Sequence, residues 1–87
     1  MNFVIVKQTG GKYLFEVPEQ VTISAGEGLV LDTYKGHQTG VALCDSFHAF
    51  GETAEMIMDA WGTKKERMKP VLGFVSFRYF KEDAENA

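Results

Sequence analysis

The order of apolar and polar residues predicts short β-strands over most of the chain. Residues 29–34 alternate, so that Leu29, Leu31 and Thr33 share one face, and a period of two is typical of a strand. A second extended run covers residues 37–47. Because only a short turn separates the two runs, we predict that they pair as a β-hairpin.

The predicted turn of this hairpin is Lys35-Gly36, because glycine accepts the positive φ that a tight turn needs. Such a turn would place Leu31 opposite Gly40. A glycine opposite a large apolar side chain usually marks a bend, a bulge or a close approach of two backbones. We therefore expect Gly40 to help the sheet curl into a barrel.

An earlier pair of runs predicts another hairpin. Residues 3–7 are apolar and β-branched, residues 13–17 are largely apolar with one charged position, and Gly10-Gly11 lies between them. Pro18 ends the second run because proline has no N–H for a strand ladder. A short extended piece at residues 21–23 follows, and two glycines within residues 24–28 predict a turn.

One helix of about ten residues is predicted before the basic stretch that begins at Lys64. Ala54, Ile57, Met58 and Trp61 have the spacing of a single helical face. Gly62 suits the left-handed position that ends a helix. Because so short a helix is unstable alone in water, its apolar face, including the tryptophan, is expected to dock on the sheet.

The last strand is predicted to follow Pro70 and to cover residues 71–80. Both of its faces are partly apolar, which indicates a strand at the centre of the sheet or beneath the helix. The whole pattern predicts a mainly β protein. We expect a small, partly open barrel of the SH3-like or OB-like kind, with five or six strands and one α-helix before the last strand.

Length and charge predict one domain with an acidic end. A chain of 87 residues, 45% of them hydrophobic, is long enough for one compact core. We predict a single domain over residues 1–81 and a disordered acidic tail over residues 82–87. Three of the twelve acidic residues lie in that tail, which has no base, so residues 1–81 hold nine acids against nine bases. A neutral body gives no general attraction to nucleic-acid backbones.

The residue types that carry chemistry predict a non-catalytic protein. The single cysteine, Cys44, is interpreted as a small apolar strand residue, and His37 and His48 lack the spacing of a zinc site. On an extended strand Cys44 and His48 would lie roughly 13 Å apart, too far for a nucleophile and its base. We therefore expect no enzyme activity, no metal and no cofactor.

The localisation predicted from the sequence is cytoplasmic. No apolar run approaches the length of a membrane-spanning helix, and the first residues lack the basic start and cleavage site of a secretory signal. A single cysteine also fits a reducing compartment.

A basic stretch after the helix supplies the candidate contact residues, which are Lys64, Lys65, Arg67 and Lys69, together with Tyr34. On small β-barrels such cations follow a nucleic-acid backbone, while exposed rings such as Tyr34 or Tyr79 stack on bases. The alternative is a solvated loop whose bases offset the nearby acids Glu52, Glu55, Asp59 and Glu66.

The function predicted first is a binding or assembly module that acts through protein contacts, with a protein partner or a second copy of the chain. The extended piece at residues 21–23 offers an edge to which another strand can add. Met56 lies off the apolar face of the helix and adds to a possible contact surface. A small barrel that binds nucleic acid is the alternative function.

Three segments carry a resemblance to known proteins: YLFEVP at residues 13–18, GLVLDT with the following glycines at residues 28–41, and KPVLG at residues 69–73. In these segments the chain resembles short uncharacterised proteins of Firmicutes and their mobile elements, which implies a shared small fold over residues 1–80. The middle segment also looks like small barrels in the N-terminal DNA-binding domain of the primosomal helicase and in ribosome-associated modules. That likeness implies nucleic-acid binding in a replication or conjugation system.

Overall fold

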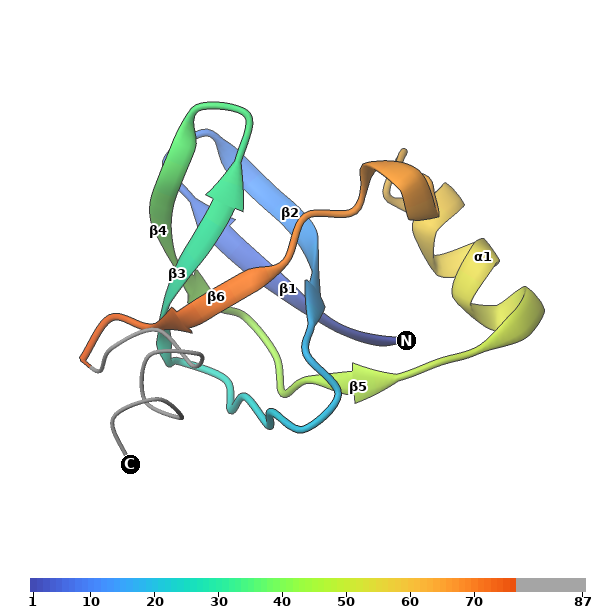
Figure 1. The fold of residues 1–87 in the computed structure, drawn as a ribbon, viewed down its shortest axis with the longest axis horizontal. Helices are drawn as coiled ribbons and strands as arrows, with labels where there is room; N and C mark the ends of the chain where they lie inside the picture. Colours follow the sequence, from blue (N-terminus) through green and yellow to red (C-terminus); the bar gives the residue numbers. More distant parts are fainter. Residues whose placement is uncertain (77–87) are drawn as a thin grey trace.

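The structure is a computed structural model that describes residues 1–76. The described part contains strands β1 (Asn2–Gln8), β2 (Gly11–Val17), β3 (Gly28–Thr33), β4 (Gly36–Ala42), β5 (Phe47–His48) and β6 (Val71–Phe74), helix α1 (Gly51–Ala60) and the short 3-10 turn η1 (Lys65–Arg67). The prediction of a mainly β chain with one α-helix before the last strand is confirmed (Figure 1). Tyr79 and the predicted tail at residues 82–87 lie outside the described residues.

The sheet consists of two hairpins joined side by side. The strand order is β2-β1-β4-β3-β6, and β5 also pairs with β1, so that it continues the path of β4. The sheet curls until its two outer strands meet, where the N–H of Glu16 donates to the carbonyl oxygen of Lys69 at 2.9 Å. This limited contact between β2 and the start of β6 makes the barrel partly open, as predicted (Figure 1).

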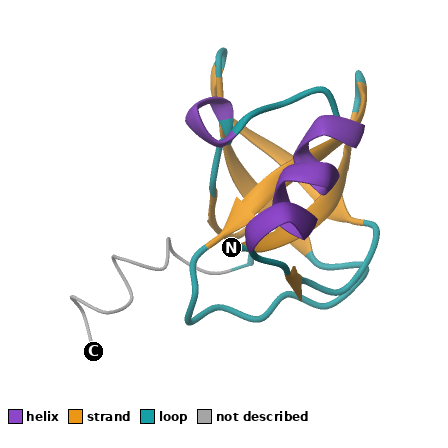
Figure 2. Cartoon of the chain, turned by 90° about the vertical axis from the view of Figure 1, so that its right-hand side faces the viewer, coloured by secondary structure: helices purple, strands orange, loops and turns teal. Residues whose placement is uncertain are grey.

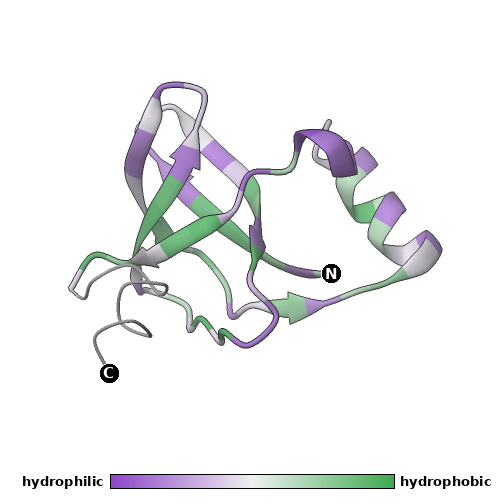
Figure 3. Ribbon diagram, in the orientation of Figure 1, coloured by the Kyte–Doolittle hydropathy of each residue, from purple (hydrophilic) through white to green (hydrophobic). Residues whose placement is uncertain are grey.

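Apolar side chains form two core clusters, one on each face of the first hairpin. The inner cluster lies inside the curled sheet and consists of Val4, Val6, Phe15, Val17, Ile23, Leu29, Leu31, Ala42 and Val71. The outer cluster lies beneath α1 and consists of Phe3, Leu14, Ala49, Ala54 and Met58. Neighbouring residues of a strand point to opposite faces, which is why Phe3 and Val4 belong to different clusters. Figure 2 shows α1 lying across the sheet, and in Figure 3 the hydrophobic colour runs along much of β1, β3 and β6, whereas most of β4 and the hairpin tips are hydrophilic or neutral.

The predicted position of the last strand is wrong. Strand β6 stands at the end of the sheet order and not at its centre. The helix does not lie over it, because Ala54 and Met58 of α1 pack with Phe3 and Leu14 of the first hairpin. Both strands of the first hairpin are covered on both faces, and the unbroken apolar run of β1 matches this double burial.

The helix has the predicted length and the predicted stop. Gly62 has a positive φ of 68°, its N–H donates to the Asp59 carbonyl at 3.0 Å, and the Thr63 N–H donates to the Met58 carbonyl at 2.9 Å. These are the two bonds of a Schellman motif. No helix among residues 1–76 has the length and apolar character needed to span a membrane.

The apolar face of the helix docks on the first hairpin through Ala54 and Met58, as expected, but Trp61 is only partly covered. Trp61 is the C-cap residue and remains 37% exposed, whereas Ala54 and Met58 are buried. The backbone leaves the helical path at this residue, so its side chain does not continue the buried face.

The hairpin of β3 and β4 turns one residue earlier than predicted. Its turn residues are Tyr34 and Lys35, and Thr33 pairs with Gly36, which alone among these residues has a positive φ, of 93°. A turn centred on Lys35-Gly36 of the mirror type I′ would force the lysine to a positive φ, which a side chain disfavours. The Thr33 hydroxyl stabilises the observed turn, since Oγ1 accepts from the Lys35 N–H at 3.1 Å and donates to the Gly36 carbonyl at 2.8 Å.

Gly40 marks a close approach of two strands. It pairs with Leu29 and not with Leu31 as predicted, because the turn is shifted. A Cβ placed on Gly40 would lie 2.5 Å from Cγ1 of Val6 and 2.9 Å from the carbonyl oxygen of Lys7. Only glycine therefore allows β4 to pass so close to β1. This close pairing of β1 with β4 joins the two hairpins into one sheet.

The predicted open edge at residues 21–23 is wrong. The segment is not a strand, and Ile23 is fully buried in the inner cluster. Both backbone groups of Ile23 are bonded to Ser46, since its N–H donates to Oγ at 3.0 Å and its carbonyl accepts from the Ser46 N–H at 2.8 Å. The backbone of Ile23 is therefore already hydrogen bonded and offers no ladder to another strand.

Candidate functional site

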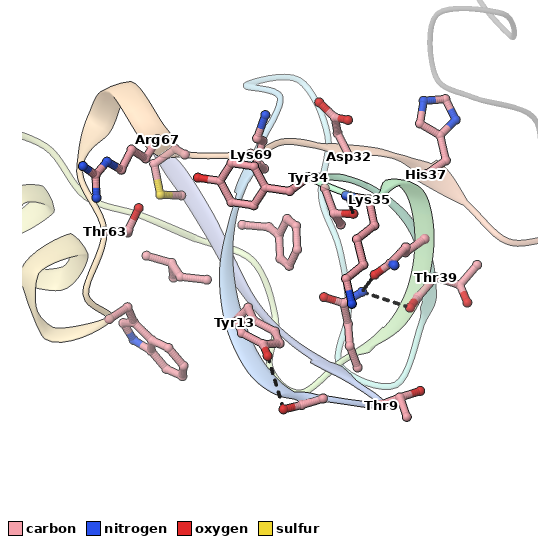
Figure 4. Close-up of a pocket in the computed structure, with 18 of the residues that line it drawn as sticks. Thr9, Tyr13, Asp32, Tyr34, Lys35, His37, Thr39, Thr63, Arg67 and Lys69 are labelled. Atoms are coloured by element: carbon pink, nitrogen blue, oxygen red, sulfur yellow. Dashed lines mark hydrogen bonds between the residues drawn. The ribbon is translucent and has the colours of Figure 1, made fainter.

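An open groove of about 1080 Å³ lies between the tips of the two hairpins and the segment that follows α1. Its lining consists of residues 8–10, 13–15, 32–35, 37–39, 61–63 and 67–69. We call it the hairpin groove, and Figure 4 shows its lining side chains.

The groove is a consequence of the sheet topology. Because β1 and β4 pair, the two hairpin tips rise at the same end of the molecule (Figure 1). The amide of Gln8 links them, since Nε2 donates to Oε1 of Gln38 at 3.1 Å. The third wall consists of residues 61–63 and 67–69, which come before β6. It lies beside the second hairpin because the Asp32 N–H donates to the carbonyl oxygen of Pro70 at 3.1 Å.

Three exposed aromatic rings line the hairpin groove, and each comes from a different element. Tyr13 of β2 is 46% exposed, Tyr34 of the β3–β4 turn is 84% exposed, and Trp61 at the end of α1 is 37% exposed. The Tyr13 hydroxyl donates to the Gly10 carbonyl at 3.2 Å, which holds this ring against its own hairpin turn (Figure 4). The buried Phe15 forms part of the floor. The groove therefore offers flat apolar faces to a ligand.

Positive charge gathers in the hairpin groove although the body of the chain is neutral. Among the described lining residues, the charged side chains are the cations Lys35, Arg67 and Lys69 and one carboxylate, Asp32. The Lys69 ammonium lies 5.1 Å from the centre of the Tyr34 ring, within the range of a cation–π contact. This local excess is hidden in the net charge of residues 1–81.

The structure divides the five predicted contact residues into two groups. Tyr34, Arg67 and Lys69 line the hairpin groove. Lys64 and Lys65 instead line a separate hollow of about 270 Å³, which they share with the acidic residues Glu55, Asp59 and Glu66. The tight turn η1 lies within this stretch, and its consecutive side chains point in different directions. Lys64 and Lys65 therefore fit the alternative of a solvated loop, in which bases lie beside acids.

Sequence reasoning missed Tyr13, Lys35 and Trp61 as groove residues. The pattern placed Tyr13 in a strand, Lys35 in a turn and Trp61 on the buried face of a helix. Their convergence depends on the pairing of β1 with β4, for which no local pattern exists. The available signal was the occurrence of a tyrosine close to each hairpin turn.

The segment from Cys44 to His48, which contains the cysteine and histidine considered above as a nucleophile and its base, holds a neighbouring loop in place. Asp45 Oδ1 accepts from the Ala25 N–H at 2.9 Å, Ser46 Oγ accepts from the Ile23 N–H at 3.0 Å, and Cys44 packs against the inner cluster. The His48 ring contacts Asn2, with Nδ1 lying 2.6 Å from Oδ1. These contacts give the segment a structural role near the start of β1, whereas the hairpin tips lie at the other end of that strand.

Comparison with known proteins finds no match to a family model, to a curated protein or to a solved structure. The resemblance described from the sequence motifs therefore stays a prediction. The function has to be argued from the hairpin groove itself.

Proposed function

We propose that this protein binds single-stranded nucleic acid in the hairpin groove. The observation that supports the proposal is that three exposed rings from three elements line the same groove as three cations. Base stacking on an aromatic side chain contributes about 1–3 kcal/mol per base. The cations supply the complementary contacts to phosphate. The base of a nucleotide can therefore stack on a ring while its phosphate contacts a cation.

Unpaired bases suit this groove better than a duplex. A ring stacks on a base only where the face of the base is free, and stacking within a duplex covers that face. The rings of Tyr13, Tyr34 and Trp61 line an open groove, and Tyr34 is 84% exposed. An unpaired base can therefore place its free face against such a ring.

The charge distribution sets the expected character of binding. A neutral body attracts phosphate only weakly, so the affinity depends on the rings and on a few local cations. For single strands, the logarithm of the binding constant falls with the logarithm of salt concentration by about 0.7 for each phosphate contact. With three cations in the groove, a shallow salt dependence is expected.

A titration by fluorescence anisotropy tests the proposal. Short labelled single strands and duplexes of DNA and RNA are added at low salt, and the single strands are expected to bind more tightly. Arg67→Gln should weaken this binding, whereas Lys12→Gln should not, because Lys12 is an exposed lysine that does not line the groove. Absence of single-strand binding at micromolar protein would end the proposal.

Protein contacts, the function that the sequence favours first, are the second candidate. Phe50 and Met56 support it, since both lie outside the groove and are 74% and 70% exposed. Aromatic residues and methionine are enriched in protein interfaces relative to the rest of the surface. A second copy of the chain is the partner that is simplest to detect, by light scattering over a range of concentrations. A dimer that Phe50→Ser dissociates would support this candidate, and a monomer throughout would reject self-association.

A further inference from the structure

We propose that the hairpin groove prefers guanine, because Asp32 accepts hydrogen bonds from the base that stacks on Tyr34. This inference rests on the proposed function and adds a base preference to it. The proposed function concerns binding of a single strand, and this inference concerns which base of that strand the groove selects.

Asp32 stands out because it is the one carboxylate among the described residues of the groove lining. A carboxylate beside cations weakens the attraction for phosphate, so its presence argues for contact with another part of the nucleotide. It is half-buried, and its N–H donates to the Pro70 carbonyl at 3.1 Å. This bond fixes the backbone of β3 beside the segment that carries Lys69.

The surroundings of Asp32 contain the other two parts of a nucleotide site. Tyr34 follows two residues later along the chain, and Lys69 lies above the Tyr34 ring at 5.1 Å. Figure 4 shows Asp32, Tyr34 and Lys69 together at one end of the groove. A base that stacks on the ring face away from the ammonium leaves Lys69 available to a phosphate. The ring, the carboxylate and the ammonium then contact the base face, the base edge and the backbone.

The chemistry of an ionised carboxylate selects among the bases. Its two oxygens only accept hydrogen bonds, so it needs two neighbouring donors. The Watson–Crick edge of guanine presents N1–H and N2–H side by side. Cytosine and adenine present an amino group next to an acceptor nitrogen, and thymine or uracil presents one N–H between two carbonyl oxygens. Those acceptors repel a carboxylate, and only an unpaired guanine offers both donors.

Modified bases test the inference on the unaltered protein. Labelled oligonucleotides of about eight nucleotides, within the footprint of small barrels, contain thymine alone or thymine alternating with guanine, 7-deazaguanine or inosine. Guanine and 7-deazaguanine share the same Watson–Crick edge, and both are expected to bind about tenfold more tightly than thymine, as for a bidentate base contact. Inosine lacks the 2-amino group and should lose most of that gain. A matching uracil and guanine series in RNA shows whether the sugar matters.

The variant Asp32→Asn tests the residue. The variant keeps the shape of the side chain but replaces one acceptor oxygen with a donor NH2 group, so it can no longer accept from both guanine donors. Most of the preference for guanine over thymine should be lost, while thymine binding remains. Asp59→Asn is the matched control, because Asp59 is an exposed acid that lines the separate hollow. Equal affinity for all bases would overturn the inference and leave single-strand binding intact. Failure of every oligonucleotide to bind would overturn the proposed function as well.

Discussion

The ammonium group of Lys69 lies 5.1 Å from the centre of the Tyr34 ring. The two residues come from distant parts of the chain, and they meet because β3 bonds to the Pro70 carbonyl that follows Lys69. Tyr34 is 84% exposed, so the lysine supplies one of the few contacts that orient its ring. The pair presents a flat face and a charge to the groove before any ligand arrives.

Removal of the Tyr34 ring should weaken single-strand binding. Tyr34→Ala is expected to cost about 1–3 kcal/mol of binding free energy, the usual contribution of one stacked base. Tyr34→Phe keeps the ring and should bind almost normally. Anisotropy titrations of both variants measure the difference. Phe50→Ala is the control for the loss of an exposed ring outside the groove, and an equal loss in that variant would contradict a specific role for Tyr34.

The basic stretch should separate into two functional groups. Arg67→Gln or Lys69→Gln is expected to lower the slope of the salt dependence by about 0.7, since each removes one phosphate contact. Lys64→Gln and Lys65→Gln should leave the slope unchanged, because these lysines lie beside three acids in the separate hollow. Titrations at several salt concentrations measure the slopes. Equal effects at all four positions would mean that the groove does not define the binding site.

Gly40 should be far less tolerant of a side chain than Gly28. In Gly40→Ala the new methyl group would meet the Val6 side chain at 2.5 Å and the Lys7 backbone at 2.9 Å. A backbone atom cannot move aside cheaply, so we expect a loss of about 1–3 kcal/mol of unfolding free energy, as for other overpacked sites. Gly40→Val should lose more.

The matched control is Gly28→Ala, where the new methyl group would meet only the Val75 side chain at 3.3 Å. Val75 is exposed and can rotate away, so the loss should be small. Urea denaturation of the three variants gives the free energies. Similar values for Gly40→Ala and Gly28→Ala would argue against a close approach of β4 to β1.

Gly62 should contribute to stability through its left-handed backbone conformation and not through close packing with its neighbours. It has a φ of 68°, and an added Cβ would meet nothing within 4 Å. Gly62→Ala is therefore expected to cost about 1–2 kcal/mol, the penalty of a left-handed conformation for a residue with a side chain. Gly62→Asn should cost less, because asparagine tolerates that conformation. Thermal unfolding followed by circular dichroism measures both, and equal melting temperatures for glycine and alanine would reject the observed cap.

Local patterns were sufficient for most of the elements. Apolar and β-branched runs predicted the strands of the first hairpin, and alternation before a glycine turn predicted the second. The spacing of Ala54, Ile57 and Met58 predicted the helix, and Gly62 predicted its end. These features depend on neighbours in the sequence, since strand and helix periods and glycine conformations are local properties. The mainly β class with one helix before the last strand follows from them.

Only the tertiary structure decided which strands pair, where the helix docks and which side chains line the groove. The turn at Tyr34-Lys35, the outer place of β6 and the docking of α1 on the first hairpin depend on which strands pair and how closely they approach. The same applies to the hairpin groove, which brings Tyr13, Tyr34 and Trp61 together from three elements. Contacts between distant segments arise from the total burial of the fold, and a one-residue shift of register changes every partner. For this reason the sequence determined Tyr34, Arg67 and Lys69 as candidates, whereas their separation from Lys64 and Lys65 required the folded chain.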